Sequence, residues 1–274
     1  MAEITAAMVK ELREASGQAM MDCKNALVEA NGDKEAAIAI LRTKSKKVQE
    51  TRLGRDTEFG RIGTFSDGKH GALVEVLCES APVAGGPDCR QFAEDLAKQL
   101  AVGPGAATVE DLLKQPCPSQ PGKTLGDQKD ELFARIKEVF RVGRIARFDG
   151  SAVGYVHATG DLAALVEFEG ADAALAKDVA MHIVASSPTA VSKESLDPAL
   201  VAKEREFLTE QARNEGKPEN IIAKMIEGRM KNFYAAQVLC EQAFVKDSEK
   251  LVADVLKAAN MKIKRFVNWK LGKE

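Results

Sequence analysis

The sequence predicts an α+β protein made of a helical N-terminal module, a duplicated core and an inserted helical hairpin. Three observations indicate this fold: three short helical patterns before residue 45, an order of strand, strand and helix that occurs twice, and two long helical patterns joined by Gly-Lys-Pro. Hydrophobic residues make up 45% of the 274 residues, and 39 Lys and Arg nearly balance 41 Asp and Glu. This composition is typical of a folded chain of roughly two domains.

The first segment predicts three short helices. Thr5 can cap a helix that ends at Gly17, and apolar residues recur along it at helical spacing. A second helix stops at Asn31-Gly32, and Asp33 caps a third. A bundle of about 45 residues is near the lower size limit for independent folding. We therefore expect a small docking module.

The sequence pattern of the middle of the chain predicts an internal duplication. The order strand, strand, helix over residues 61–100 recurs over residues 152–183, with Leu-Val-Glu in each second strand and Asp-apolar-Ala in each helix. Each copy is expected to be an antiparallel hairpin covered by a helix. Between the copies, an amphipathic helix is expected over residues 128–142. The matched pairs are Gly63 with Gly154, Glu75 with Glu167, and Asp95 with Asp178.

Two long helices are predicted over residues 198–214 and 219–234. The intervening Gly216-Lys217-Pro218 is a stop and restart signal, because Gly favours a helix end and Pro a helix start. The narrow apolar stripe with charged flanks indicates an antiparallel hairpin. Such a hairpin is either self-contained or a docking surface for a partner, including a second copy of the chain.

These patterns define the expected domains. Residues 43–55 carry five basic residues and one acidic residue, which is typical of a solvated linker helix, with a nucleic-acid or ribosome contact as the alternative. The predicted domains are a module and basic linker over 1–55, a first core subdomain over 56–143, a second over 144–187 and 237–274, and the hairpin over 188–236.

Composition excludes several classes of protein. The five cysteines are scattered without a C-x-x-C pair, so we expect neither a metal site nor disulfides. A formal charge of −2 gives no general attraction to nucleic acid. No apolar run approaches the roughly 18 residues of a membrane helix, and the N-terminus lacks a signal-peptide core. We expect a cytoplasmic protein without a cofactor.

No catalytic group is predicted. Gly122-Lys123-Thr124 resembles the end of a phosphate-binding loop, but Cys117 stands where that loop needs its first Gly, and three nearby prolines lack the required N–H groups. The three histidines are far apart and form no catalytic pattern. Binding is therefore favoured over covalent catalysis.

Segments in both halves of the chain resemble bacterial elongation factor Ts. The most specific are Ser16-Gly17, Met20-Met21-Asp22-Cys23-Lys24, Asn31-Gly32-Asp33, Gly216-Lys217-Pro218, Glu227-Gly228-Arg229-Met230 and Gln242-Ala243-Phe244-Val245. The resemblance covers nearly the whole chain. It implies a UBA-like N-terminal module and a guanine-nucleotide exchange factor that binds the GDP-bound and nucleotide-free forms of the GTPase elongation factor Tu. Such a factor disturbs the Mg²⁺ and phosphate site, so that GDP leaves and GTP rebinds.

The resemblance also implies contact residues. They are Arg13, Met20, Met21 and Lys24 in the N-terminal module, and His157 and Val245 in the second subdomain. Two adjacent methionines beside cations suit a docking patch, because Met adapts its shape and charge fixes orientation. One of the two methionines is expected to pack against the three-helix core.

One loop departs from the family pattern. The family reads Cys-Gln-Thr-Asp-Phe-Val-Ala where this chain has Cys-Glu-Ser-Ala-Pro-Val-Ala, so the contact loop becomes Ser80, Ala81, Pro82 and Val83. The carboxylate is lost, and a rigid but smaller Pro replaces the aromatic wedge. We expect the loop backbone and the bulk of Pro82 to displace the element of the GTPase that lies beside its Mg²⁺ site, with Ser80 bonding locally.

Two other classes remain as alternatives. Three-helix modules also occur in nascent-chain or ubiquitin-type adaptors, although ubiquitin binders usually have an aromatic residue in the first loop, which here reads Ser16-Gly17-Gln18. The alternative that the chain is a nucleotide-hydrolysing enzyme is supported only by the incomplete phosphate loop that ends at Thr124.

Overall fold

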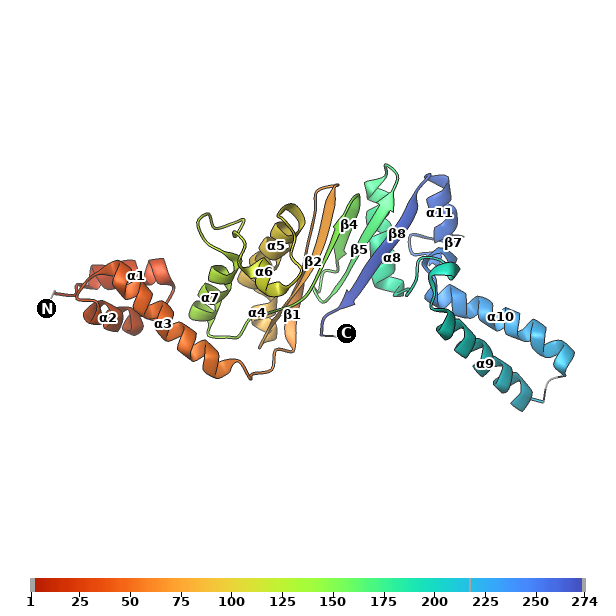
Figure 1. Cartoon of the computed structure of the whole chain (residues 1–274), viewed down its shortest axis with the longest axis horizontal. Coiled ribbons are helices and arrows are strands. Elements are labelled where there is room, and N and C mark those ends of the chain that lie inside the picture. The colour runs from red at the N-terminus through yellow and green to blue at the C-terminus, as the bar shows by residue number, and fades with distance from the viewer. Residues whose placement is uncertain (1–2, 217, 273–274) are drawn as a thin grey trace. The chain divides into compact units, whose positions relative to one another are not determined.

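The computed structural model describes residues 3–216 and 218–272, with only the backbone at residues 219 and 220. It combines helices with small antiparallel sheets, so the predicted α+β class is confirmed (Figure 1). Two compact units are present: one comprises residues 1–65, 72–147 and 271–274, and the other comprises residues 66–71 and 148–270.

The chain begins with α1 (Ala6–Ser16), α2 (Met20–Glu29) and α3 (Lys34–Arg52). As predicted, Thr5 caps α1 by accepting a hydrogen bond from a backbone N–H of the first turn, and Asp33 caps α3 in the same way. Residues 43–52 of the basic segment form the second half of the 19-residue α3, and residues 53–55 follow the helix. The three helices bury Val9, Leu12, Cys23, Ala26, Leu27, Ala37 and Leu41.

The first unit continues with a sheet in the order β1-β2-β3, with β1 (Phe59–Ser66), β2 (His70–Cys78) and β3 (Arg141–Asp149). A Cβ at Gly63 of β1 would lie 2.2 Å from the Ala93 carbonyl oxygen, so β1 approaches the neighbouring helix closely because residue 63 has no side chain. The third strand was not predicted.

Four helices accompany this sheet. They are α4 (Ala81–Gly85), α5 (Pro87–Val102), α6 (Val109–Leu113) and α7 (Leu125–Ile136). Their apolar residues and those of β2 form one core, in which Phe92 and Phe140 meet edge to face with centroids 6.5 Å apart. The predicted helix over 128–142 is wrong at its end, because Lys137 adopts a left-handed conformation with φ 64° and stops α7.

The second unit holds an antiparallel sheet in the order β4-β5-β8. Its strands are β4 (Ala152–Val156), β5 (Leu162–Glu169) and β8 (Lys262–Lys270), and α8 (Ala173–Ser186) packs on it (Figure 1). Shorter elements complete the unit: η1 (Lys193–Ser195), η2 (Leu239–Glu241), β6 (Ala243–Phe244), β7 (Asp247–Leu251) and α11 (Val252–Ala258).

Two glutamates matched in the predicted duplication each pair with an arginine of the neighbouring strand. Glu75 of β2 pairs with Arg144 of β3 at 2.6 Å, and Glu167 of β5 pairs with Arg265 of β8 at 2.6 Å. Both carboxylates are buried, and buried charges are normally paired in this way. The duplication itself stays a prediction.

The predicted hairpin consists of α9 (Pro198–Asn214) and α10 (Glu219–Gln237), which lie side by side (Figure 1). Arg205 pairs with Glu227 at 2.6 Å across the two helices. The seam buries Leu208, Ala212, Ile222, Ile226 and Met230. Among the described residues, neither these helices nor any other helix is apolar over enough length to cross a membrane.

Candidate partner-binding surfaces

The first candidate surface lies at the start of α2. Met20 is 53% exposed and Met21 is 62% exposed, and Lys24 and Arg13 are exposed as well. The expectation that one methionine packs against the core is wrong, because Cys23, Ala26 and Leu27 fill the buried face of α2. Two apolar, flexible side chains thus face solvent on α2, with the exposed Lys24 one helical turn after Met20, which is the composition of a docking patch.

The second candidate surface is the loop after β2. Ala81 and Pro82 are exposed, whereas Val83 is half-buried and packs against the core of the first unit. Pro82 lies in the first turn of α4, a single helical turn. Since the proline ring fixes φ near its helical value, the exposed tip is rigid.

Two side chains before the tip anchor this loop. The expectation that Ser80 bonds locally is wrong, because its hydroxyl donates a hydrogen bond of 2.7 Å to Glu138 Oε1, 58 residues away in the sequence. Glu79 accepts a bond from the Val139 N–H at 2.8 Å and pairs with Arg55 at 2.9 Å. Partial burial acts to raise the pKa of Glu79, but the Val139 N–H and the Arg55 guanidinium hold it below its usual range.

The third candidate surface lies in the second unit. His157 is exposed in the β4–β5 turn, where its Nδ1 lies 2.8 Å from Thr159 Oγ1. Val245 is 51% exposed between β6 and β7, and the preceding Phe244 is buried. The two predicted contact residues therefore occupy turns at the ends of different strands.

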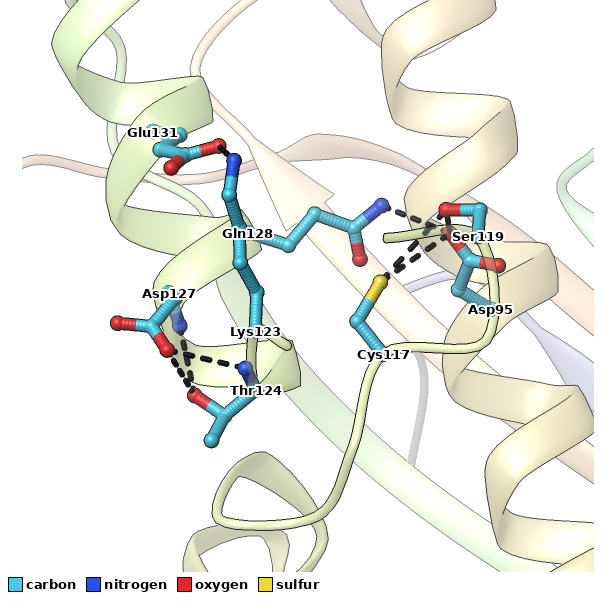
Figure 2. Close-up of polar contacts among 8 residues, drawn as sticks. All are labelled: Asp95, Cys117, Ser119, Lys123, Thr124, Asp127, Gln128 and Glu131. Carbon is cyan, nitrogen blue, oxygen red and sulfur yellow. Dashed lines mark hydrogen bonds and ion pairs between the residues drawn. The ribbon is translucent and has the colours of Figure 1, made fainter. Parts of the chain in front are cut away.

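The incomplete phosphate loop has its polar groups engaged within the protein (Figure 2). Lys123 Nζ pairs with Glu131 at 2.7 Å, as Figure 2 shows. The Thr124 hydroxyl accepts a hydrogen bond from the Asp127 N–H, and the Asp127 carboxylate accepts one from the Thr124 N–H, forming a capping box at the start of α7. The Lys and Thr that would hold a nucleotide instead stabilise α7.

The segment before this capping box is fastened to α5 by a buried carboxylate. Asp95 Oδ2 accepts hydrogen bonds from Ser119 Oγ at 2.5 Å and Gln128 Nε2 at 2.8 Å, and the Cys117 thiol lies 3.8 Å from it (Figure 2). Hydrogen bonds compensate the burial of Asp95. The Pro-rich segment is thus a structural connector.

Comparisons with known proteins identify the family. A family model described as Elongation factor TS matches residues 82–273. Elongation factor Ts of Methylococcus capsulatus is 41% identical over an alignment 274 residues long, which covers 98% of this chain and 92% of the relative. The proteins of that name from Hydrogenovibrio crunogenus and Alkalilimnicola ehrlichii are 38% and 40% identical, over the same shares of both chains. The chain belongs to the elongation factor Ts family.

The resemblance of the sequence to elongation factor Ts is thereby confirmed. Sequence reasoning nevertheless missed side chains that hold the candidate surfaces, because they lie far away in the chain. Glu138 anchors the loop from the α7–β3 turn, and His182 of α8 hydrogen-bonds the backbone of Val245. His182 lies in the Ala-Met-His segment of α8, and its position on an apolar helix face was the available signal of burial.

Proposed function

We propose that this chain promotes GDP release from elongation factor Tu through three surfaces: the α2 methionine patch, the Ser80–Val83 loop and the Val245 region. Its function as a member of the elongation factor Ts family is guanine-nucleotide exchange on elongation factor Tu, a step of translation. The observation that carries this conclusion is 38–41% identity to three elongation factors Ts over 98% of the chain. An adaptor without exchange activity is not favoured.

Exchange needs no covalent step. A protein that binds the nucleotide-free GTPase more tightly than the GDP-bound form must weaken GDP binding by the same factor by which GDP weakens its own binding. A shift of about 10⁴-fold corresponds to a differential of about 5.5 kcal/mol. Contacts on a few separate surfaces can supply this difference, and the chain needs no cofactor for it.

The α2 patch supplies apolar contact. The side chains of Met20 and Met21 are free to adapt to an apolar groove, and Lys24 and Arg13 can orient the approach by charge. We assign this patch, on a UBA-like module, the role of holding the complex together. We expect its loss to weaken affinity more than the rate of release in the bound state.

The Ser80–Val83 loop is assigned the role of displacing the element of the GTPase beside Mg²⁺. It has no carboxylate at its tip, so displacement depends on bulk and rigidity. Pro82 supplies both, and the Ser80–Glu138 bond and the Glu79 contacts hold the base of the loop against the first unit. A wedge that is already ordered loses little conformational entropy on binding.

The second unit contributes His157 and Val245, and the hairpin is assigned to a second copy of the chain. Leu200 and Phe207 of α9 are 41% and 60% exposed and lie seven residues apart, which is two helical turns on one face. We retain the domain division 1–55, 56–143, 144–187 with 237–274, and 188–236 as part of this proposal. The site of action is the cytoplasm.

Release of fluorescent GDP tests the function. Elongation factor Tu loaded with fluorescent GDP is mixed with this chain and excess unlabelled GDP, and the fluorescence decay is followed. We expect faster release that saturates with the concentration of the chain. The matched control carries Met20→Ala and Met21→Ala, which should shift the half-saturating concentration upward. No acceleration at stoichiometric amounts would contradict the proposal.

A further inference from the structure

A buried histidine lies directly behind the segment that carries Val245. His182 of α8 is 0% exposed, and its ring lies 5.9 Å, between centroids, from the ring of Phe244. Phe244 belongs to the hydrophobic core of the second unit and His182 is buried beside it, whereas the side chain after Phe244, that of Val245, is 51% exposed. The segment therefore turns from the core to the surface at the residue that the imidazole contacts.

The imidazole is held in one orientation by a chain of hydrogen bonds. The Val245 N–H donates to His182 Nδ1 at 3.1 Å, so Nδ1 carries no proton. In a neutral ring the proton then lies on Nε2, which donates to Gln242 Oε1 at 2.9 Å. Gln242 Nε2 in turn donates to the Ala236 carbonyl at 3.0 Å, in the last turn of α10.

The surroundings favour the neutral ring that this arrangement needs. Burial lowers the pKa of His182, while the hydrogen bond to Gln242 acts in the opposite direction. A doubly protonated ring has no lone pair left for the Val245 N–H. The backbone of Val245 is thus bonded only by the neutral form of His182.

A second contact from α8 fixes the other side of Val245. Lys246 Nζ pairs with Asp178 Oδ1 at 2.6 Å, and Asp178 lies one helical turn before His182. On the near side, the Phe244 side chain is buried in the core. The exposed valine is therefore held by a buried neighbour, a backbone hydrogen bond and an ion pair at three successive residues.

We propose that His182 is a positioning residue for binding of the partner GTPase: it fixes the backbone of Val245 so that the exposed side chain is presented in its binding orientation. Through Gln242 it also ties that orientation to the end of α10, at the base of the hairpin. The inference rests on the proposed contact between Val245 and the GTPase. Without the imidazole the binding-competent conformation is only part of the population, and the apparent Kd rises by the inverse of that fraction.

A double-mutant cycle tests this role. The wild type, His182→Ala, Val245→Ala and the double variant are titrated against nucleotide-free elongation factor Tu, and Kd is measured for each. We expect His182→Ala to raise Kd by about 3- to 10-fold, which lies within the range by which residues in contact can couple. In the Val245→Ala background the same substitution should raise Kd by less than about 2-fold, because no side chain remains to be positioned.

Two further variants separate positioning from general destabilisation. Leu256→Ala removes a buried side chain of the same core that contacts neither His182 nor Val245 through a hydrogen bond. It should lower the thermal midpoint as His182→Ala does, but change Kd equally in both Val245 backgrounds. Asp178→Ala removes the ion pair with Lys246 without opening the core, so it tests whether the Val245 segment must be held in place even where His182→Ala fails to fold. It should weaken binding about 2- to 3-fold, only when Val245 is present.

The possible failures are distinguishable. If His182→Ala, or Asp178→Ala in its place, raises Kd equally with and without the Val245 side chain, the positioning role is wrong while the exchange function stands. If Val245→Ala binds as the wild type does, the Val245 contact and the role of His182 fall together. If the wild type fails to accelerate GDP release from elongation factor Tu, the proposed function itself is wrong.

Discussion

At the scale of single residues, Pro82 lies in the loop where this chain departs from the elongation factor Ts pattern. It stands where the elongation factor Ts pattern carries an aromatic residue, and the preceding carboxylate is replaced by Ala81. In the structure this loop is ordered by contacts within the first unit. Ser80 is bonded to Glu138, and Pro82 lies in the first turn of α4, so the tip has little freedom to lose on binding.

Substitution of Pro82 separates rigidity from bulk. Pro82→Gly removes both. We expect GDP release at a saturating concentration of this chain to slow by about 5- to 10-fold, since ordering the loop then costs about 1 kcal/mol more in conformational entropy. Pro82→Ala keeps helical preference and should lose less. Stopped-flow release of fluorescent GDP measures both variants. Unchanged release in Pro82→Gly would show that the driving contacts lie elsewhere, such as the α2 patch.

The buried imidazole of His182 makes stability depend on pH. Burial lowers its pKa in the folded protein below the ordinary 6.5, so between these two values the unfolded chain binds more protons. The free energy of unfolding contributed by His182 is therefore fully present above pH 6.5 and is lost as the pH falls through 6.5 toward the folded value.

Urea unfolding across this range checks the prediction. We expect the difference in unfolding free energy between the wild type and His182→Asn to shrink as the pH is lowered from 8 to 5.5. The reason is that the unfolded wild-type chain takes up a proton at this position, whereas the variant has no group there to titrate. The groups common to both proteins cancel in the difference. A difference that is constant with pH would contradict the assignment of a depressed pKa to His182.

At the scale of elements, α7 shows what local sequence can and cannot predict. Its amphipathic pattern indicated a helix, and a helix is present. The pattern continued to residue 142, however, because apolar residues at 139, 140 and 142 fit a helical face as well as a strand. Lys137 in the left-handed region ends the helix, and the following residues enter β3. Such a stop at a lysine has no strong local signal, since Gly is the usual residue there.

The cap of α7 gives a prediction about the connector. Thr124→Ala removes the acceptor of the Asp127 N–H, and we expect a loss of about 0.5–2 kcal/mol in unfolding free energy, the usual cost of a lost N-cap. Thr124→Ser keeps the acceptor and should cost little. Denaturant midpoints measure both variants, and equal midpoints would show that the cap contributes nothing. Because Thr124 caps α7, we expect no nucleotide binding by the wild type or by either variant.

The strands β3 and β8 were missed for a different reason. Each pairs with a strand far away in the sequence, and β3 carries three arginines that interrupt an apolar alternation. Arg144 and Arg265 nevertheless contribute to the sheets, because they pair with the buried Glu75 and Glu167. A buried glutamate in a strand predicts a cationic partner, but local sequence does not say which strand supplies it.

At the scale of the whole molecule, the candidate contacts divide between two units with separate cores. Met20, Met21 and the Ser80–Val83 loop belong to the first unit, and His157 and Val245 belong to the second. The candidate contact positions stay predictions, and they come from residues that resemble the elongation factor Ts pattern. Their supports were not predictable, because Glu138 and His182 act through contacts across 58 and 63 residues of sequence.

This division predicts additivity between surfaces. Met20→Ala with Met21→Ala alters the first unit, and Val245→Ala alters the second, and the two sites share no hydrogen-bond network among the described residues. We expect the fold-increases in Kd for nucleotide-free elongation factor Tu to multiply when the substitutions are combined, within about 0.5 kcal/mol in free energy. Titration of the four proteins measures this. A combined loss well below the product would mean that the surfaces engage the GTPase as one coupled element. That result would also remove the contrast with His182 and Val245, whose effects should not multiply because one residue acts through the other.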